Sequence, residues 1–279
     1  MRELSWNLPF GPLAALEWGE PDAPPLLALH GWLDNAASFA ALAPLLAKDF
    51  RVIALDMPGH GRSAHLPPGV TRYHVADYVD HALNAADALQ LPRFNLLGHS
   101  LGAGVASLTA AAAPARVEKL ALIEGLGPLA DDGAQTLQRW RDAEAQRSVG
   151  RRAPRVFAST DEALAARVAV GDLGADEARA LVLRGLREVE GGYAWSSDAR
   201  LRLPTPLRID ELQLRRLLAG IESPTLLLLA DPETPYLPRA TMEARAACMR
   251  DIRIERIAGR HHLHVQHPRE VAERLIAFM

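Results

Sequence analysis

The sequence lacks most of the features that mark secreted, membrane-spanning and nucleic-acid-binding proteins. It has a single cysteine, Cys248, among 279 residues, which excludes an internal disulfide and fits a reducing compartment. No apolar core of signal-peptide length follows Met1, and the longest apolar runs, such as 226–230, are too short to cross a bilayer. A net charge of -3 gives no reason to expect nucleic acid as a partner. We therefore expect a soluble, cytoplasmic protein without a membrane span.

Motifs that bind metal ions or phosphates are absent as well. His261, His262 and His264 lie close together, but a zinc site needs three or four converging ligands, and the sequence has no HExxH pattern or matching set of cysteines. We expect His262 and His264 to be packing or hydrogen-bonding neighbours. The segment 56–63 lacks the glycine and lysine spacing of a phosphate loop and is predicted to be a structural turn. The sequence thus predicts no metal ion and no cofactor.

The most informative motif that is present is Gly98-His99-Ser100-Leu101-Gly102. It lies between a predicted strand, 94–97, and a predicted helix, 101–113, and in that context it indicates a nucleophilic serine on a sharp turn. Cβ atoms at positions 98 and 102 would collide with neighbouring backbone, and the turn holds the serine in a strained conformation. The positive end of the following helix faces any charge that develops beside Ser100. We predict that Ser100 is a nucleophile.

Strands and helices alternate around this motif. The alternation predicts a mostly parallel sheet with right-handed crossovers and helices on both faces. In such sheets ligands bind at the carboxyl ends of the strands. The loops at His30, Asp56, Gly98 and Glu124 each follow a predicted strand, so we expect them at one edge. The predicted strands are 13–19, 25–29, 51–55, 94–97, 117–123, 225–230 and 252–257.

The alternation breaks between residues 126 and 220. No convincing apolar strand is found there, and a helical insertion between two sheet strands indicates a cap over the active edge. We therefore expect an α/β core of residues 1–125 and 221–279, with residues 126–220 as a helical cap. Its predicted helices are 135–146, 161–170, 176–188 and 210–218. Arg147, Arg151, Arg152 and Arg155 are expected on a solvated face, with an anion-binding patch as the alternative.

A nucleophilic serine needs a base, and the base needs an acid. His261 is the candidate base because it follows the last predicted strand, so its loop should return to the edge that holds Ser100. Two positions compete for the acid. Glu124 ends the strand before the cap, whereas Asp231 and Glu233 follow the strand after it. Asp231 is also typical of a turn, and a carboxylate flanked by apolar residues, as Glu124 is, needs a partner when buried. We favour Glu124 and keep Glu233 as the alternative.

The tetrahedral intermediate of acyl transfer needs backbone N–H donors for its oxyanion. Leu101 offers one at the start of the helix that follows Ser100. Trp32 offers the second, because Gly31 lets that loop come close. The Trp32 ring either lines the site or packs in the core. His99 either supports the site or is a structural histidine.

These motifs together resemble the α/β-hydrolase superfamily over nearly the whole chain except the cap. Segments 30–35 (HGWLDN) and 124–128 (EGLGP) look closer to its serine hydrolase-like branch. The superfamily usually places its acid after the post-cap strand, where this chain has Glu233, and some members place it one strand earlier, where this chain has Glu124. The resemblance implies an α/β-hydrolase fold with the order nucleophile, acid, histidine. The segments that carry it are His30-Gly31-Trp32, 56–63, 98–102 and Gly259-x-His261.

A serine at position 100 argues against the haloalkane dehalogenase and epoxide hydrolase branches, which the resemblance implies would have aspartate there. We predict a serine hydrolase that acts on small-molecule carboxylic esters through an acyl-serine intermediate. The alternative from another class is a receptor or scaffold that uses the same site only to bind a ligand. Among enzymes, hydrolysis of amide, thioester or carbon–carbon bonds stays open.

Overall fold

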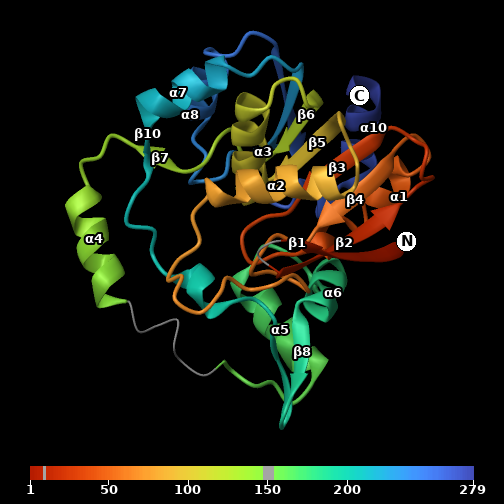
Figure 1. The fold of residues 1–279 in the computed structure, drawn as a ribbon, viewed down its shortest axis with the longest axis vertical. Helices are drawn as coiled ribbons and strands as arrows, with labels where there is room; N and C mark the ends of the chain where they lie inside the picture. Colours follow the sequence, from red (N-terminus) through yellow and green to blue (C-terminus); the bar gives the residue numbers. More distant parts are fainter. Residues whose placement is uncertain (9–10, 147–153) are drawn as a thin grey trace.

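A central sheet of eight strands organises the chain (Figure 1). The structure is a computed structural model that describes residues 1–8, 11–146 and 154–279. In spatial order the strands are β1 (Arg2–Leu8), β2 (Gly11–Trp18), β4 (Arg51–Leu55), β3 (Pro25–Leu29), β5 (Phe94–His99), β6 (Val117–Ile123), β11 (Thr225–Asp231) and β12 (Ile252–Ala258). Strands β4 to β12 in this order are parallel, and β1 and β2 add an antiparallel edge. The predicted α/β fold with a mostly parallel sheet is confirmed.

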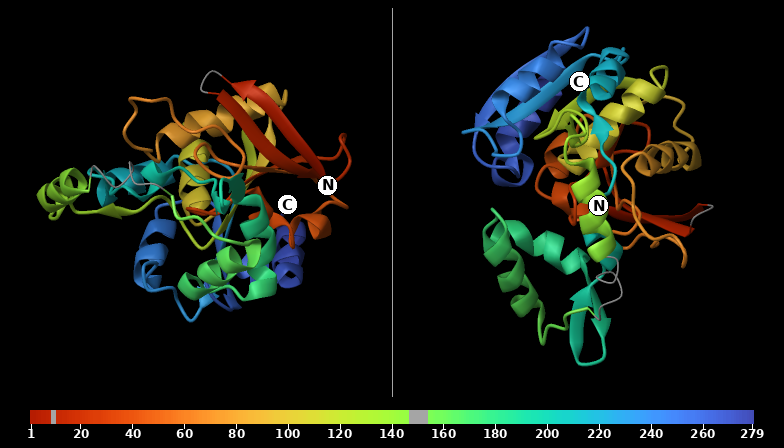
Figure 2. Two further views of the ribbon diagram at one scale, coloured as in Figure 1. Left: turned by 90° about the horizontal axis from the view of Figure 1, so that it is seen from below. Right: turned by 90° about the vertical axis from the view of Figure 1, so that its left-hand side faces the viewer.

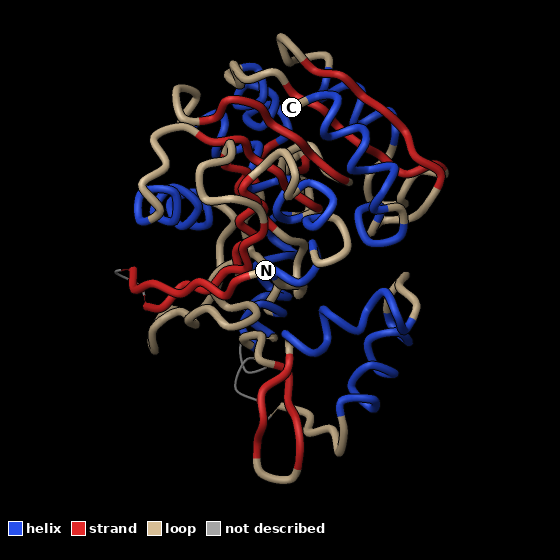
Figure 3. The backbone as a smooth tube through the Cα atoms, turned by 90° about the vertical axis from the view of Figure 1, so that its right-hand side faces the viewer, coloured by secondary structure: helices blue, strands red, loops and turns tan. Residues whose placement is uncertain are grey.

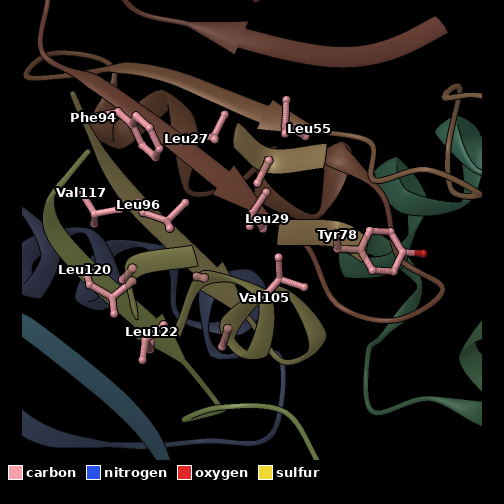
Figure 4. Packing of buried hydrophobic residues seen from close by; sticks show 14 of the residues in the cluster. Leu27, Leu29, Leu55, Tyr78, Phe94, Leu96, Val105, Val117, Leu120 and Leu122 are labelled. Carbon is pink, nitrogen blue, oxygen red and sulfur yellow. The ribbon is translucent and has the colours of Figure 1, made fainter. Parts of the chain in front are cut away.

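Helices cover both faces of the sheet because the central strands are apolar on both sides. One face packs against α2 (Asp77–Ala88), α3 (Leu101–Ala112), α7 (Glu211–Ala219) and α8 (Arg239–Ala246). The other face packs against η1 (Ala36–Phe39), α1 (Ala43–Leu46), α9 (Leu263–Gln266) and α10 (Pro268–Phe278). Figure 4 shows part of the first layer, in which leucines from neighbouring strands gather around Val105 of α3. The two layers hold the strand ends in fixed positions.

Strand β1 was not predicted from the sequence. Leu4, Trp6 and Leu8 alternate with exposed residues, and all three pack against the core from the edge of the sheet. The strand is half-buried and polar on its other side, so no continuous apolar run marks it.

Between β6 and β11 the chain leaves the sheet. After β7 (Ala130–Asp131) and α4 (Thr136–Ala145), residues 154–202 form a separate small cluster, which we call the lobe (Figures 2 and 3). The lobe contains α5 (Thr160–Val170), α6 (Ala175–Arg184), a hairpin of β8 (Leu186–Val189) and β9 (Gly192–Trp195), and η3 (Ala199–Arg202). Phe157, Leu164 and Leu181 belong to its own apolar core. The chain then returns through β10 (Ile209–Asp210), which pairs with β7.

Three expectations for this segment need correction. The helix predicted over 176–188 ends at Arg184, and residues 186–195 form a hairpin, although no strand was expected there. Most residues of these short strands are only partly buried or exposed, so no apolar run marks them in the sequence. In addition, α7 packs on the sheet through Leu214 and Leu218, so the expected cap range 126–220 includes a helix of the core layer. Of the arginines expected on a solvated face, Arg147, Arg151 and Arg152 lie outside the described residues.

Candidate active site

Ser100 occupies a strained turn between β5 and α3. Its φ of 53° and ψ of -113° lie outside the regions that L-residues ordinarily adopt. A Cβ on Gly98 would lie 2.4 Å from the carbonyl oxygen of Gly102, and one on Gly102 would lie 2.0 Å from that of Leu29. Both glycines are therefore required by the close approach of neighbouring backbone. The turn lifts the Ser100 side chain out of the sheet at its carboxyl edge.

His261 reaches the same edge from the loop between β12 and α9. Its Nε2 lies 2.9 Å from Ser100 Oγ, and its Nδ1 lies 3.2 Å from Oε2 of Glu124. An ionised carboxylate only accepts hydrogen bonds, so Nδ1 carries the proton and Nε2 is left to accept the serine hydroxyl. The side chain is 15% exposed, which leaves the ring open to a small molecule.

Glu124 follows β6 and is buried, with a φ of 54°. Its Oε1 accepts the backbone N–H of Ala230 at 2.6 Å, and its Oε2 accepts the hydroxyl of Thr234 as well as His261 Nδ1–H. The carboxylate is thus held by the end of β11 on one oxygen and by the loop after β11 on the other. Thr234 was not singled out from the sequence, because a threonine near a proline-rich turn carries no chemical signal of its own.

The other two candidate carboxylates lie at the surface. The exposed Glu233 accepts a hydrogen bond from the backbone N–H of Arg239 at the start of α8. Asp231 is exposed and lies 3.8 Å from the Arg239 guanidinium. Within the described residues, no hydrogen bond links either carboxylate to His261.

The two expected backbone donors flank the Ser100 turn. Leu101 is the first residue of α3, where N–H groups have no partner within the helix. Trp32 follows Gly31, where an added Cβ would lie 3.0 Å from His99 Nδ1, so a larger residue would crowd this loop. The Trp32 ring is 54% exposed and its Nε1–H donates to Leu201 of the lobe at 3.1 Å, so the core-packing alternative is wrong.

Buried histidines hold the loops around these donors. His30 donates from Nδ1 to the carbonyl of Gly31 and accepts the N–H of Met57 on Nε2. Burial lowers the pKa of His30 to about 4, so the ring is neutral. His99 donates from Nε2 to the carbonyl of His261 at 2.9 Å, which fixes the loop that carries the histidine. His264 bonds to Ser38 at 2.6 Å and is the buried packing neighbour that was expected.

A charged cluster beside the site was not found by sequence reasoning. His262 lies between two carboxylates, with Nδ1 2.6 Å from Asp172 and Nε2 3.2 Å from Asp34. Burial alone would lower the pKa of His262, but these two hydrogen bonds outweigh it and raise the pKa to about 9. Arg167 of α5 lies 3.4 Å from the second oxygen of Asp34. Because the members come from loops and helices far apart in sequence, no local sequence pattern predicts that they meet.

The segment 56–63 is a structural turn, as predicted. The buried Asp56 accepts the N–H of Ala36 at 2.7 Å and that of Arg62 at 2.8 Å. It also forms an ion pair at 2.8 Å with Arg184 of α6, which in turn reaches Glu3 on β1. This buried cation ties the lobe to the core.

A cavity of about 2130 Å³ lies between the sheet edge and the lobe. Ser100, Glu124 and His261 line it from the sheet. Trp32, Leu129, Val170 and Leu207 also line it and are 54%, 57%, 84% and 56% exposed. The cavity therefore has polar, titratable side chains at one end and apolar side chains along its other sides. Such an arrangement suits a nucleophilic attack on a small molecule with an apolar part.

Comparison with known proteins shows the family of the chain. Residues 24–268 match the family model described as alpha/beta hydrolase fold, and the chain belongs to this family. Within it the chain falls in the serine hydrolase-like branch. A serine hydrolase-like protein of Danio rerio is 31% identical over 99% of this chain and 88% of its own length. These findings support a hydrolase.

Solved structures share the fold of this chain. A hypothetical protein from Pseudomonas aeruginosa PAO1 has a TM-score of 0.90 and 39% identity, covering 100% of this chain and 99% of its own. The thioesterase domain from the curacin biosynthetic pathway has a TM-score of 0.86 and 25% identity, covering 99% of both chains. Among the described residues, no helix is long and apolar enough to span a membrane.

Proposed function

We propose that this protein is a serine hydrolase that cleaves carboxylic esters, with Ser100 as nucleophile, His261 as base and Glu124 as the acid that orients it. The observation that carries the proposal is the unbroken hydrogen-bonded chain from Ser100 Oγ through His261 to Glu124. The strained turn supports it, because non-glycine residues held at a φ such as the 53° of Ser100 cluster at functional sites.

In the proposed reaction, Ser100 Oγ attacks the ester carbonyl carbon while its proton passes to His261 Nε2. The N–H groups of Leu101 and Trp32 hold the resulting oxyanion, and Glu124 stabilises the imidazolium. Collapse of the intermediate expels the alcohol, which takes the proton from His261. Water then attacks the acyl-serine, again through His261, and releases the acid with Ser100 restored.

The cavity supports a small ester with an apolar part. Val170 and Leu207 line it and are largely exposed, so covering them with an acyl or alcohol group would remove apolar surface from water. We propose further that the lobe, within residues 126–220, acts as the cap that selects this group. Thioesters are a second candidate class, favoured by the likeness to a thioesterase domain.

The test is hydrolysis of p-nitrophenyl esters and acyl thioesters of graded acyl length by the wild type and by Ser100→Ala. We expect turnover by the wild type and a loss on the order of a thousandfold or more in Ser100→Ala, since the serine and its base act as a unit. Ser107→Ala on the same helix is the matched control, because the Ser107 hydroxyl bonds to the backbone of Ala103 and Gly127 and to no catalytic candidate among the described residues.

Two results would contradict the proposal. Full activity in Ser100→Ala would remove the serine from the mechanism. Ligand binding by both proteins without turnover of any acyl compound would instead favour the receptor or scaffold.

A further inference from the structure

Asp34, His99 and His262 bring three metal-ligating atoms together beside the candidate active site. Asp34 Oδ2 lies 3.2 Å from His262 Nε2 and 4.0 Å from His99 Nδ1, and all three atoms lie within 4.8 Å of one another. The three residues are buried and come from the loops or ends of β3, β5 and β12 at the carboxyl edge of the sheet. No role in the proposed ester hydrolysis falls to these atoms.

The hydrogen bonds of His99 leave one nitrogen for a metal ion, and those of His262 direct a second nitrogen toward Asp34. His99 Nε2 donates to the carbonyl of His261, so its Nδ1 carries the lone pair, and this buried atom has no hydrogen-bond partner among the described residues. His262 Nδ1 is held by Asp172 at 2.6 Å, which directs Nε2 toward Asp34. A second partner on each ligating ring, a carbonyl or a carboxylate, is the usual support of a metal-bound histidine.

Asp34 is supported in the same manner. Its Oδ1 faces Arg167 at 3.4 Å, so Oδ2 is the oxygen that faces the two histidines. Two imidazoles with one carboxylate suit Zn²⁺ or a similar divalent transition metal ion, not Mg²⁺ or Ca²⁺, which prefer oxygen ligands.

We propose that Asp34, His99 and His262 bind one divalent transition metal ion such as Zn²⁺, with the fourth position open to the cavity. Bonds of about 2.0–2.2 Å in a tetrahedron require ligand atoms about 3.3 Å apart. The Asp34–His262 distance already meets this, and the His99 nitrogen must approach by about an ångström. The ion takes the place of the proton that His262 Nε2 shares with Asp34. All three residues line the cavity, which gives the ion a way in.

The experiment is calorimetric titration of Zn²⁺ into the untagged, chelator-treated wild type and into Asp34→Asn and His262→Gln. We expect one ion per chain in the wild type and binding at least about tenfold weaker in each variant. His267→Gln is the matched control, because His267 is an exposed histidine near the same loop and should leave the affinity unchanged. Circular dichroism checks that each variant is folded.

A second measurement needs no variant. Co²⁺ bound to the wild type in place of Zn²⁺ should give the strong visible absorption of a tetrahedral site, which Zn²⁺ then displaces. Absence of saturable Zn²⁺ binding, wild-type affinity in both variants, or the weak spectrum of hydrated Co²⁺ would each overturn the proposal. None of these readouts depends on ester hydrolysis, so the metal site and the proposed function can fail independently.

Discussion

The sheet edge and the lobe form opposite walls of one cavity, and they are built in different ways. At the sheet edge, Ser100, Glu124 and His261 each sit where a strand ends, and backbone contacts fix two of them at positive φ. The lobe has its own small apolar cluster, to which Val265 of α9 also belongs, and it is joined to the sheet edge by hydrogen bonds and ion pairs as well, such as Arg184 with Asp56 and Trp32 with Leu201. The comparison is consistent with the proposal that the sheet edge carries the reaction and the lobe selects the substrate.

The largest effect on activity is expected from a substitution at the sheet edge. Glu124→Gln should lower kcat by about 10³–10⁴-fold, because a neutral amide neither selects the correct His261 tautomer nor stabilises the imidazolium. Glu233→Gln is the matched control and should stay within about twofold, since Glu233 is exposed and bonds to Arg239. Steady-state ester hydrolysis measures both. The opposite pattern, in which Glu233→Gln loses activity and Glu124→Gln keeps it, would make Glu233 the acid.

The buried ion pair of Arg184 and Asp56, which joins the lobe to the core, should stabilise the folded protein. Arg184→Met leaves Asp56 buried with its backbone donors but without its cation, so we expect a loss of about 3 kcal/mol in the free energy of unfolding. Arg93→Met removes a pair with Glu118 in which both side chains are exposed, and should change the free energy by less than about 1 kcal/mol. Urea unfolding followed by circular dichroism compares them. Equal losses in the two variants would argue against a structural role for the buried tie.

The buried histidines should make the stability of the core depend on pH. Burial lowers the pKa of His30 to about 4 and that of His60 to about 3, so both rings are neutral in the folded protein at pH 7. Their unfolded pKa is about 6.5, so below that pH the unfolded chain binds more protons. Stability should then fall by about 1 kcal/mol per group for each pH unit between 6.5 and 4.

All ten histidines lie outside residues 126–220, so this acid sensitivity belongs to the core and not to the lobe. Melting temperature measured from pH 7 to pH 5 should decline, and His60→Gln should flatten the decline. A profile that is level over this range in the wild type would contradict the assignment.

Much of the core was predictable because its features are local. Apolar runs such as 117–123 coincide with buried strands, and the pentapeptide around Ser100 gave its turn and the need for both glycines. Glu124 was favoured because a carboxylate among apolar residues needs a partner, and the structure places it 3.2 Å from His261.

The parts that were missed depend on contacts between distant segments. The hairpin at 186–195 is stabilised by the lobe's own packing and by pairing of Phe157 with Tyr193, which no short window of sequence reveals. The cluster of Asp34, Asp172 and His262 joins residues far apart in the chain. Each member is visible in the sequence as a single titratable residue. That the three lie close together can be seen only from the folded structure.

The most direct test of the central claim is reaction of the folded protein with a fluorophosphonate, which modifies only an activated serine. We expect rapid incorporation of one phosphonyl group per chain, located by mass spectrometry on Ser100, with no labelling of Ser100→Ala and slow labelling of His261→Gln. An unreactive wild type, or labelling at another residue that persists in Ser100→Ala, would contradict the assignment of Ser100 as a nucleophile activated by His261.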